Sequence, residues 1–160
     1  MANGDRHIPP PGRRQGLFPR PDDEVGPVPR PPGILVGEDE ALVRSMLEVG
    51  LRQHGFAVWL AANGLEAIEV YHRHRDAIDL VLLDVRMPGL DGPKTWGLLE
   101  RLNPSLRCCF MTGDLGRYTE AELLQLRAAH VFRKPFKIDQ VAALFLQLFD
   151  EQRAVQSASG

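Results

Sequence analysis

The sequence predicts one α/β domain built on a doubly wound, five-stranded parallel sheet. Short apolar runs alternate five times with stretches whose apolar residues recur at helical spacing, and the connections between them are short. A length of 160 residues is enough for one domain with a proper core and too small for two ordinary domains. Right-handed crossovers would place helices on both faces of such a sheet and the C-terminal ends of all five strands at one edge.

The clearest strand is the segment 80–84, Leu-Val-Leu-Leu-Asp, which is followed closely by Pro88-Gly89. Consecutive apolar residues of this kind are typical of a strand that is buried on both faces. The carboxylate of Asp84 comes at the C-terminal end of this strand, where open α/β sheets form the crevice in which ligands bind. Asp84 is therefore the first residue for which we expect a chemical role.

The other strands and the helices are expected in order along the chain. Apolar runs predict strands over residues 34–37, 56–61, 106–111 and 131–132. Apolar residues at helical spacing follow each strand, and the last helix is expected over 138–149. The first helix should stop at His54-Gly55, and the side chains of Asn63 and Thr119 can cap the second and fourth helices.

The two ends of the chain are expected to lie outside the folded domain, which should cover residues 33–152. Residues 1–32 are rich in proline and nearly free of apolar periodicity, so we expect a disordered arm with some polyproline II character. The Pro29-x-x-Pro32 spacing could suit a polyproline-binding partner, although a solvated tail is the interpretation we favour. Residues 153–160 are expected to form a short flexible tail.

Composition and charge argue against several functional classes. A formal net charge of −2 leaves no basic footprint for nucleic acid and no polybasic anchor for a membrane surface. No apolar stretch approaches about 18 residues and no signal peptide is recognisable, so we expect a cytoplasmic protein without a membrane segment. The adjacent Cys108 and Cys109 should point to opposite faces of a strand, as small core residues rather than as a redox or metal pair.

Polar side chains stand at the ends of four of the predicted strands. They are Glu38 and Asp39 after the first strand, Asp84 in the third, Thr112 after the fourth and Lys134 after the fifth. Three carboxylates close together repel one another unless a cation or protons neutralise them, and oxygen ligands of this kind suit Mg²⁺. The ammonium and the hydroxyl are then donors for an oxyanion held between the metal and the protein.

These features resemble the receiver domain of two-component response regulators. Four motifs in the right order, each at a strand end, carry the resemblance and together span about residues 33–150. They are Ile34-Leu35-Val36-Gly37-Glu38-Asp39-Glu40, Leu80 through Gly92, Met111-Thr112-Gly113 and Arg133-Lys134-Pro135-Phe136. The resemblance implies a flavodoxin-like fold with the strand order 2-1-3-4-5.

The resemblance also implies a role for each acidic residue. Asp84 would accept a phosphoryl group from a phosphohistidine of a sensor histidine kinase or of a phosphotransfer protein. Asp39 and Asp84 would bind Mg²⁺ directly, Glu38 would act through a water molecule, and the backbone carbonyl of Arg86 would complete the protein ligands. The cofactor implied is therefore Mg²⁺, bound at the residue that is phosphorylated.

The remaining polar residues fit the needs of phosphoryl transfer, which depends on positioning and on neutralisation of charge. Lys134 would supply positive charge and Thr112 a hydrogen bond to a phosphoryl oxygen. Negative charge added at Asp84 would draw both inward and change the surface of the fourth helix, fifth strand and fifth helix. That surface would bind an unknown downstream protein or a second copy of the chain. The chain would be a stand-alone receiver and no enzyme beyond its own phosphorylation and dephosphorylation.

Some positions depart from the family pattern or tune it. Val131 stands where the family usually has an aromatic switch residue, and the neighbouring Phe132 should face the other side of the strand as a core residue. Arg86 and Asp114 stand two positions after the acceptor and the hydroxyl, where the family tunes the lifetime of the phosphoryl group. An ion pair of these two over the site would slow the access of water, and an energetically neutral surface pair is the open alternative.

Other functions fit parts of the pattern. A haloacid-dehalogenase-type phosphatase would need a second aspartate where Arg86 stands. A nucleotide-binding Rossmann domain would need a glycine-rich turn where the acidic run 38–40 stands. A receiver-fold scaffold that acts by protein binding alone is the main alternative, because Val131 weakens the case for a phosphorylation switch. The intact set of acidic residues, threonine and lysine argues against it.

Overall fold

The structure is a computed structural model in which residues 29–159 are described. Five strands alternate with five helices, and a helix follows each strand. In order, the elements are β1 (Gly33–Gly37), α1 (Ala41–Gln53), β2 (Ala57–Ala61), α2 (Gly64–His74), β3 (Leu80–Asp84), α3 (Gly92–Leu102), β4 (Arg107–Thr112), α4 (Glu120–Gln125), β5 (His130–Arg133) and α5 (Ile138–Ala158). This alternation confirms the predicted α/β class.

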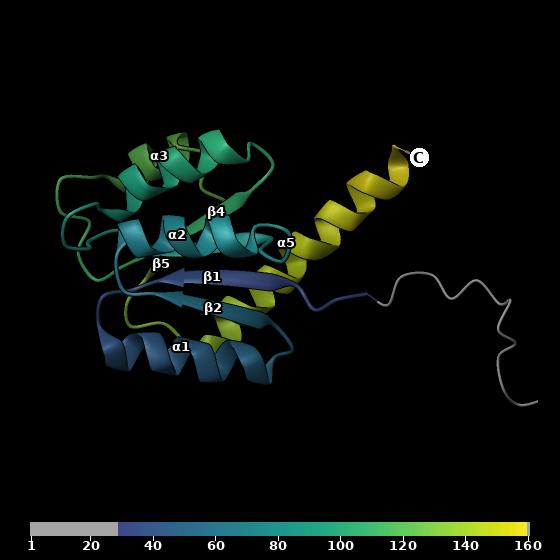
Figure 1. The fold of residues 1–160 in the computed structure, drawn as a ribbon, viewed down its shortest axis with the longest axis horizontal. Helices are drawn as coiled ribbons and strands as arrows, with labels where there is room; N and C mark the ends of the chain where they lie inside the picture. Colours follow the sequence, from purple (N-terminus) through teal and green to yellow (C-terminus); the bar gives the residue numbers. More distant parts are fainter. Residues whose placement is uncertain (1–28, 160) are drawn as a thin grey trace, which may run out of the picture. The chain divides into compact units, whose positions relative to one another are not determined.

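The five strands form one parallel sheet in the order β2-β1-β3-β4-β5 (Figure 1). β3 lies at the centre, between β1 and β4. All five of its residues are buried, as its apolar run predicts for a strand with helices on both faces. The predicted doubly wound, flavodoxin-like fold and its strand order are confirmed.

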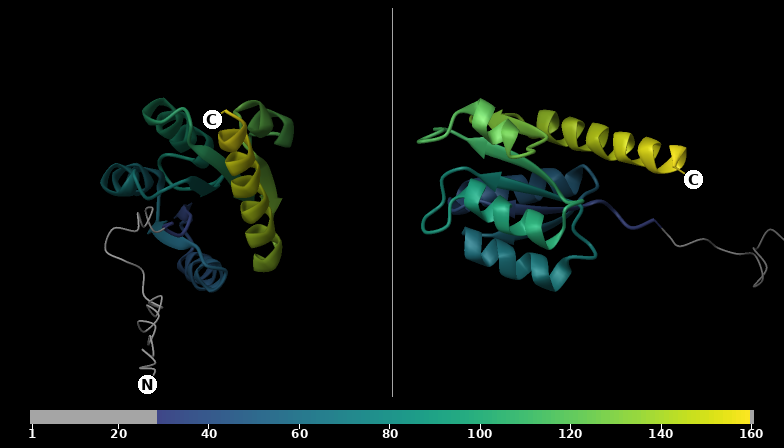
Figure 2. Two further views of the ribbon diagram at one scale, coloured as in Figure 1. Left: turned by 90° about the vertical axis from the view of Figure 1, so that its right-hand side faces the viewer. Right: turned by 90° about the horizontal axis from the view of Figure 1, so that it is seen from above.

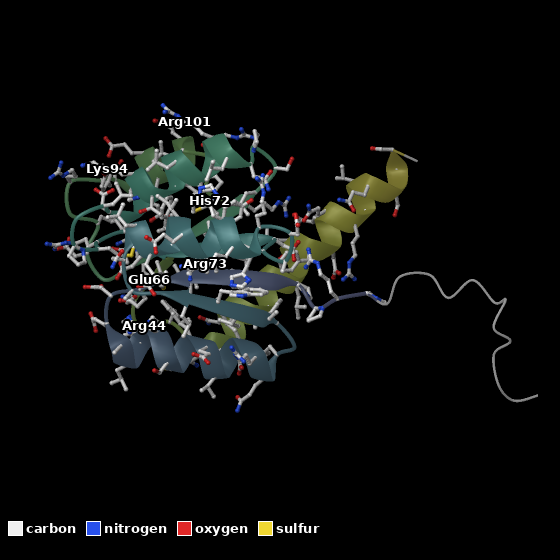
Figure 3. The ribbon with its side chains drawn as sticks, viewed as in Figure 1. Arg44, Glu66, His72, Arg73, Lys94 and Arg101 are labelled. Carbon is white, nitrogen blue, oxygen red and sulfur yellow. The ribbon has the colours of Figure 1, made fainter. Side chains whose placement is uncertain are left out.

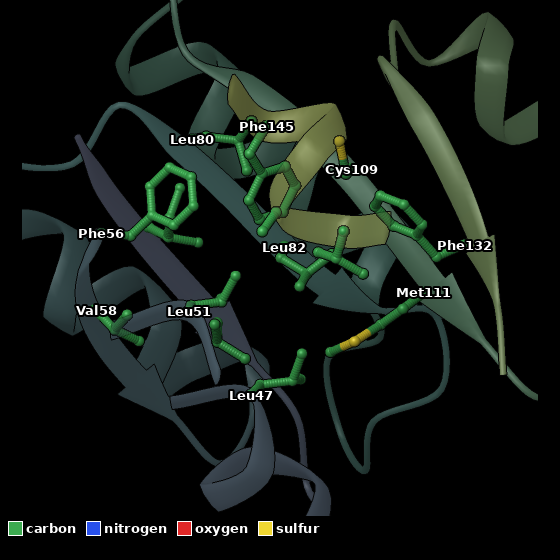
Figure 4. Close-up of a cluster of buried hydrophobic side chains, with 14 of the residues drawn as sticks. Leu47, Leu51, Phe56, Val58, Leu80, Leu82, Cys109, Met111, Phe132 and Phe145 are labelled. Atoms are coloured by element: carbon green, nitrogen blue, oxygen red, sulfur yellow. The ribbon is translucent and has the colours of Figure 1, made fainter. Parts of the chain in front are cut away.

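Each face of the sheet carries its own apolar core. α1 and α5 cover one face, where Leu47, Leu51 and Phe145 pack with strand residues (Figure 4). α2, α3 and α4 cover the other face, where Tyr71 and Trp96 are the largest buried side chains. Figure 1 shows α2 and α3 above the strands and α1 below them, and Figure 2 shows the same layers from two further directions. The two cores hold the strand ends in fixed positions.

Alternation along the strands decides which core a residue joins. Cys108 belongs to the core under α2, α3 and α4, whereas Cys109 belongs to the core under α1 and α5. Val131 and Phe132 divide between the two cores in the same way. Both thiols are free, and burial raises the pKa of Cys109 to about 12, so this thiol stays protonated at neutral pH. The predicted core placement of the cysteines and of Phe132 is confirmed.

The expected helix ends are also present. Asn63 Oδ1 accepts a hydrogen bond from the backbone N–H of Glu66 at 2.9 Å at the start of α2. Thr119 and Glu122 bond each other's backbone N–H in a capping box at the start of α4. Gly55, with φ of +91°, follows the end of α1 in a conformation that favours glycine.

The C-terminal helix is longer than expected. α5 continues past Phe149 to Ala158 and so includes most of the segment 153–160, for which we expected a short flexible tail. Residues 150–158 contain no glycine or proline, and most of them are good helix formers, which explains the continuation. Four of the five strands, β1, β2, β4 and β5, have boundaries that differ from the expected ones by one residue, which is ordinary uncertainty at element ends.

The N-terminal arm is only partly described. Residues 29–32 form neither helix nor strand, and the rest of the expected arm, residues 1–28, lies outside the described part of the chain. Among residues 29–159, none of the helices combines the length and the apolar character that crossing a membrane requires.

Two glycines of α3 offer a matched test of the packing behind Asp84. A Cβ atom on Gly92 would lie 2.2 Å from the backbone carbonyl oxygen of Asp84, whereas a Cβ on Gly97 would meet nothing within 4 Å. We expect Gly92→Ala to lower the free energy of unfolding by about 2 kcal/mol, because backbone must shift. Gly97→Ala should raise it by about 0.5–1 kcal/mol, because alanine favours the helix. Urea denaturation measures both free energies of unfolding. If both substitutions changed the stability in the same direction, the tight packing of Gly92 against Asp84 would be contradicted.

Candidate functional site

The predicted carboxylates meet at the C-terminal edge of the sheet. Glu38 and Asp39 follow β1, and Asp84 is the last residue of β3, which pairs with β1. One carboxylate oxygen from each residue lies within 4.8 Å of the others. Glu38 and Asp84 are buried, whereas Asp39 is exposed. The parallel pairing therefore brings together three side chains of like charge from two distant parts of the sequence.

The structure places Lys134 against two of these carboxylates. Its Nζ donates to Glu38 Oε2 at 2.8 Å and to Asp84 Oδ2 at 3.0 Å. The backbone N–H of Lys134 donates to the carbonyl oxygen of Thr112 at 2.8 Å, next to the pairing of β4 with β5. The sheet thus fixes the backbone from which the ammonium reaches the acidic cluster.

Burial and charge shift the protonation equilibria of this group. The pKa of Glu38 is raised to about 7: burial is the main cause, the charge of Asp84 adds to it, and the hydrogen bond from Lys134 opposes it. For Lys134, burial acts to lower the pKa, but the hydrogen bonds to Glu38 and Asp84 outweigh burial and raise it. Lys134 is therefore charged at neutral pH, while Glu38 is close to half protonated.

A pocket of about 310 Å³ opens beside the cluster, and its lining residues are Asp39, Glu40, Asp84, Arg86, Thr112, Gly113, Asp114 and Lys134. Asp84 Oδ1 accepts a long hydrogen bond of 3.3 Å from the backbone N–H of Arg86. The carboxylates of Glu38, Asp39 and Asp84 outnumber the single ammonium of Lys134, so the cluster keeps a net negative charge. The pocket can therefore take a cation, either alone or together with an oxyanion that the cation holds.

The hydroxyl of Thr112 is engaged within its own loop. Its Oγ1 donates to the backbone carbonyl oxygen of Asp114 and accepts from the backbone N–H of the same residue at 3.0 Å. Thr112 is buried and lines the pocket. In this state its hydroxyl has its hydrogen bonds to Asp114, so a contact with a phosphoryl oxygen would require these bonds to change.

An ion pair joins the two loops that border the pocket. Arg86 Nη1 lies 2.6 Å from Asp114 Oδ2, so the pair that we expected between these residues is present. The backbone N–H of Gly116 donates to Asp114 Oδ1, and this bond, together with the charge of Arg86, lowers the pKa of Asp114. The two side chains are 66% and 63% exposed, so the pair contributes little to stability.

Two contacts of this region were not expected from the sequence. Arg44 Nη1 donates to the backbone carbonyl oxygens of Glu38 at 2.8 Å and of Asp39 at 3.3 Å. Tyr118 Oη donates to Asp91 Oδ2 at 2.8 Å and so links the β4–α4 loop to the start of α3. The sequence does contain a signal for the contact of Arg44. A cation near a helix N-terminus interacts unfavourably with the helix dipole, so another favourable contact is expected at that position. The contact of Tyr118 joins distant loops and leaves no local signal.

Comparison with known proteins identifies the class that this fold and this site define. Residues 34–145, more than half of the chain, match the family model described as the response regulator receiver domain. Sporulation initiation phosphotransferase F of Bacillus subtilis (strain 168) is 34% identical over 110 residues, which cover 68% of this chain and 86% of that protein. The chain belongs to the response regulator receiver domain family of two-component signalling.

Two further relatives show the range of proteins that contain this domain. Sensor kinase CckA of Brucella abortus (strain 2308) is 32% identical over 123 residues, which cover 74% of this chain but only 13% of the kinase. The crystal structure of the response regulator protein TrrA from Thermotoga maritima, in complex with Mg(2+)-BeF, has 26% sequence identity and a TM-score of 0.65. The match covers 73% of this chain and 98% of TrrA.

The acidic cluster fits the Mg²⁺ that this family binds in its acidic pocket. Mg²⁺ prefers oxygen ligands and is usually held by one or two carboxylates with several waters. Asp39 and Asp84 offer carboxylate oxygens at the pocket, and the cluster retains a net negative charge after pairing with Lys134. A role for the backbone carbonyl of Arg86 stays a prediction.

The raised pKa of Glu38 predicts a pH dependence of metal binding. Below about pH 7 Glu38 carries a proton in the metal-free protein, so the cluster loses one negative charge and holds Mg²⁺ less tightly. We expect the Kd for Mg²⁺ to rise by up to about tenfold per pH unit below 7 and to change little between pH 8 and 9. Calorimetric titration measures this profile. Glu38→Gln, which cannot ionise, should remove the dependence near pH 7, and an unchanged profile in this variant would refute the assignment to Glu38.

Proposed function

We propose that Asp84 accepts a phosphoryl group from a phosphohistidine of a sensor histidine kinase or phosphotransfer protein. The observation that carries the proposal is the position of Asp84: its carboxylate lies in the pocket, bonded to Lys134 and beside Glu38 and Asp39. The curated names of the two relatives, a phosphotransferase and a sensor kinase, agree with a place in phosphorelay signalling.

The transfer can be written with the residues of the pocket. A carboxylate oxygen of Asp84 forms a bond to phosphorus, and the phosphorus–nitrogen bond of the donor breaks, with its electron pair passing to the imidazole. The product is an acyl phosphate on Asp84. Lys134, which already contacts Asp84 Oδ2, offsets the negative charge that the phosphoryl group brings. Asp84 is 5% exposed, so its surroundings limit the access of competing water.

In this proposal Mg²⁺, when bound, neutralises charge on the phosphoryl oxygens and orients them. Asp39 and Asp84 would hold it directly, with the backbone carbonyl of Arg86. Both oxygens of Glu38 already have partners, since Oε1 accepts from the backbone N–H of Glu40 and Oε2 from Lys134. This arrangement supports a role of Glu38 through a water molecule rather than as a direct ligand.

The output would come from the surface formed by α4, β5 and α5. Thr112 would leave its bonds to Asp114 and donate to a phosphoryl oxygen, which would change the loop that leads into α4. Leu124 and Leu126 at α4 and Leu146 on α5 are large apolar side chains that are at least 39% exposed. These leucines support binding of a downstream protein or of a second copy of the chain at this surface.

The Arg86–Asp114 pair would tune how long the phosphoryl group lasts. It joins the loop after β3 to the loop after β4 at the rim of the pocket that holds Asp84. Closing this rim would slow the approach of water to the acyl phosphate. The exposed position of the pair means that its effect would fall on the rate of dephosphorylation and not on stability.

Incubation with acetyl phosphate and Mg²⁺, followed by intact mass measurement, tests the proposal. We expect one phosphoryl group per chain, formed as the phosphorus–oxygen bond of acetyl phosphate breaks and acetate leaves. Asp84→Asn and removal of Mg²⁺ with a chelator should each abolish the adduct. Asp150→Asn, an exposed residue of α5 far along the chain from the cluster, is the matched control and should be phosphorylated like the natural chain.

The same assay distinguishes the main alternative. Some receivers accept phosphate only from a protein donor, so a negative result with acetyl phosphate is followed by incubation with a phosphorylated histidine kinase. If neither donor modifies Asp84, the phosphorylation mechanism is wrong and a scaffold that signals by binding alone becomes the better account. An adduct that persists in Asp84→Asn would instead place the acceptor at another residue.

A further inference from the structure

The acidic loop, residues 38–40, carries two of the three clustered carboxylates and has an unusual set of anchors. The backbone N–H of Glu38 donates to the carbonyl oxygen of Ala61 at 3.0 Å, which ties the start of the loop to the end of β2. The helix α1 that follows begins at Ala41, and its N-cap residue, Glu40, makes no side-chain capping hydrogen bond. Glu38 Oε1 accepts from the backbone N–H of Glu40 instead, so the turn is held at this N–H, and the carbonyl oxygens of Glu38 and Asp39 need another donor.

Arg44 supplies this donor from within α1. Its Nη1 donates to the carbonyl oxygens of both Glu38 and Asp39, at 2.8 and 3.3 Å. Its own backbone N–H donates to the carbonyl oxygen of Glu40 in the first turn of the helix. The side chain is partly buried and lies at the end of α1 nearest the strand C-termini (Figure 3). One side chain thus bridges the first helical turn and the loop that precedes it.

The chemistry of the contact differs from that of Lys134. Lys134 bonds carboxylate oxygens of Glu38 and Asp84 and so competes with any other ligand of those atoms. Arg44 bonds backbone carbonyls, which brings a permanent positive charge to the cluster while the carboxylate oxygens stay available. The orientation of Asp39 depends most on this contact, because its exposed carboxylate accepts no hydrogen bond from any described residue in the structure.

We propose that Arg44 is a positioning residue that holds the acidic loop so that Asp39 faces the metal pocket. This inference rests on the metal site of the proposed function and adds to it the group that orders one of its ligands. The contact acts through the backbone of Asp39, so it affects the affinity for Mg²⁺ more than the chemistry at Asp84. Groups that orient metal ligands in this way typically change metal affinity by about 10–100-fold when they are removed.

The test is the Kd for Mg²⁺, measured by calorimetry on the full chain at pH 8. We expect Arg44→Ala to raise the Kd by about tenfold or more, and Arg44→Lys, which keeps the charge and one donor, to restore part of the affinity. Arg52→Ala is the matched control, because Arg52 lies on the same helix and donates to the carbonyl oxygen of Val58, away from the acidic loop. Its Kd should equal that of the natural chain.

A second readout separates positioning from general damage to the fold. At saturating Mg²⁺ the rate of phosphorylation of Arg44→Ala by acetyl phosphate should approach that of the natural chain, whereas half-saturation should need more Mg²⁺. Circular dichroism melting reports whether each variant is folded, and Arg44→Lys replaces Arg44→Ala in the comparison if the alanine variant does not fold. An unchanged Kd in a folded Arg44 variant would overturn the inference.

The outcomes keep this inference apart from the proposed function. Phosphorylation of the natural chain with an unchanged Kd in Arg44→Ala would remove the role of Arg44 and leave the function intact. Weaker Mg²⁺ binding in Arg44→Ala, with no phosphorylation of the natural chain by any donor, would support the role of Arg44 and remove the function. A natural chain that binds no Mg²⁺ would contradict both.

Discussion

Repulsion among Glu38, Asp39 and Asp84 is the constraint on which the rest of the site depends. Two of these carboxylates are buried, where like charges interact more strongly than in water. Lys134 contacts both buried groups, yet the pKa of Glu38 is still raised to about 7, mainly by burial and in addition by the charge of Asp84, so one ammonium offsets these effects only in part. A site with unbalanced negative charge responds strongly to a divalent cation and to the protonation state of its members.

The fold is what imposes this constraint. Parallel pairing of β1 with β3 sets the ends of both strands side by side, and the two apolar cores keep these ends from moving apart. Gly92 packs its α-carbon against the backbone of Asp84, so the turn after β3 has little room to relax. The loops on the other side of the pocket are joined by exposed or local contacts, such as the Arg86–Asp114 pair. The acidic side of the pocket is thus held by backbone packing, whereas the side that carries Thr112 is held by local bonds and is the one we expect to change.

The sequence predicted the parts of this arrangement that follow from strand ends. Asp84 and Lys134 could be placed because the C-termini of parallel strands share one edge, whatever their separation in the chain. The hydrogen bonds of the Thr112 hydroxyl could not be predicted, since they depend on the conformation of a loop. The contact of Arg44 with the acidic loop was not predicted either, although a cation near a helix N-terminus is a local signal. Apolar spacing predicts an end of α5 near Phe149, because the last turns of the helix contain helix-forming residues but few apolar ones.

The most direct test of the electrostatic account is the melting temperature of the natural chain and of Asp84→Asn, each measured with a metal chelator and with Mg²⁺. Removal of one charge from the cluster should raise the melting temperature in the chelator, because Lys134 keeps Glu38 as a partner while the repulsion falls. Mg²⁺ should stabilise the natural chain and leave Asp84→Asn nearly unchanged. A variant that is less stable without metal, or that gains as much stability from Mg²⁺ as the natural chain, would contradict the account.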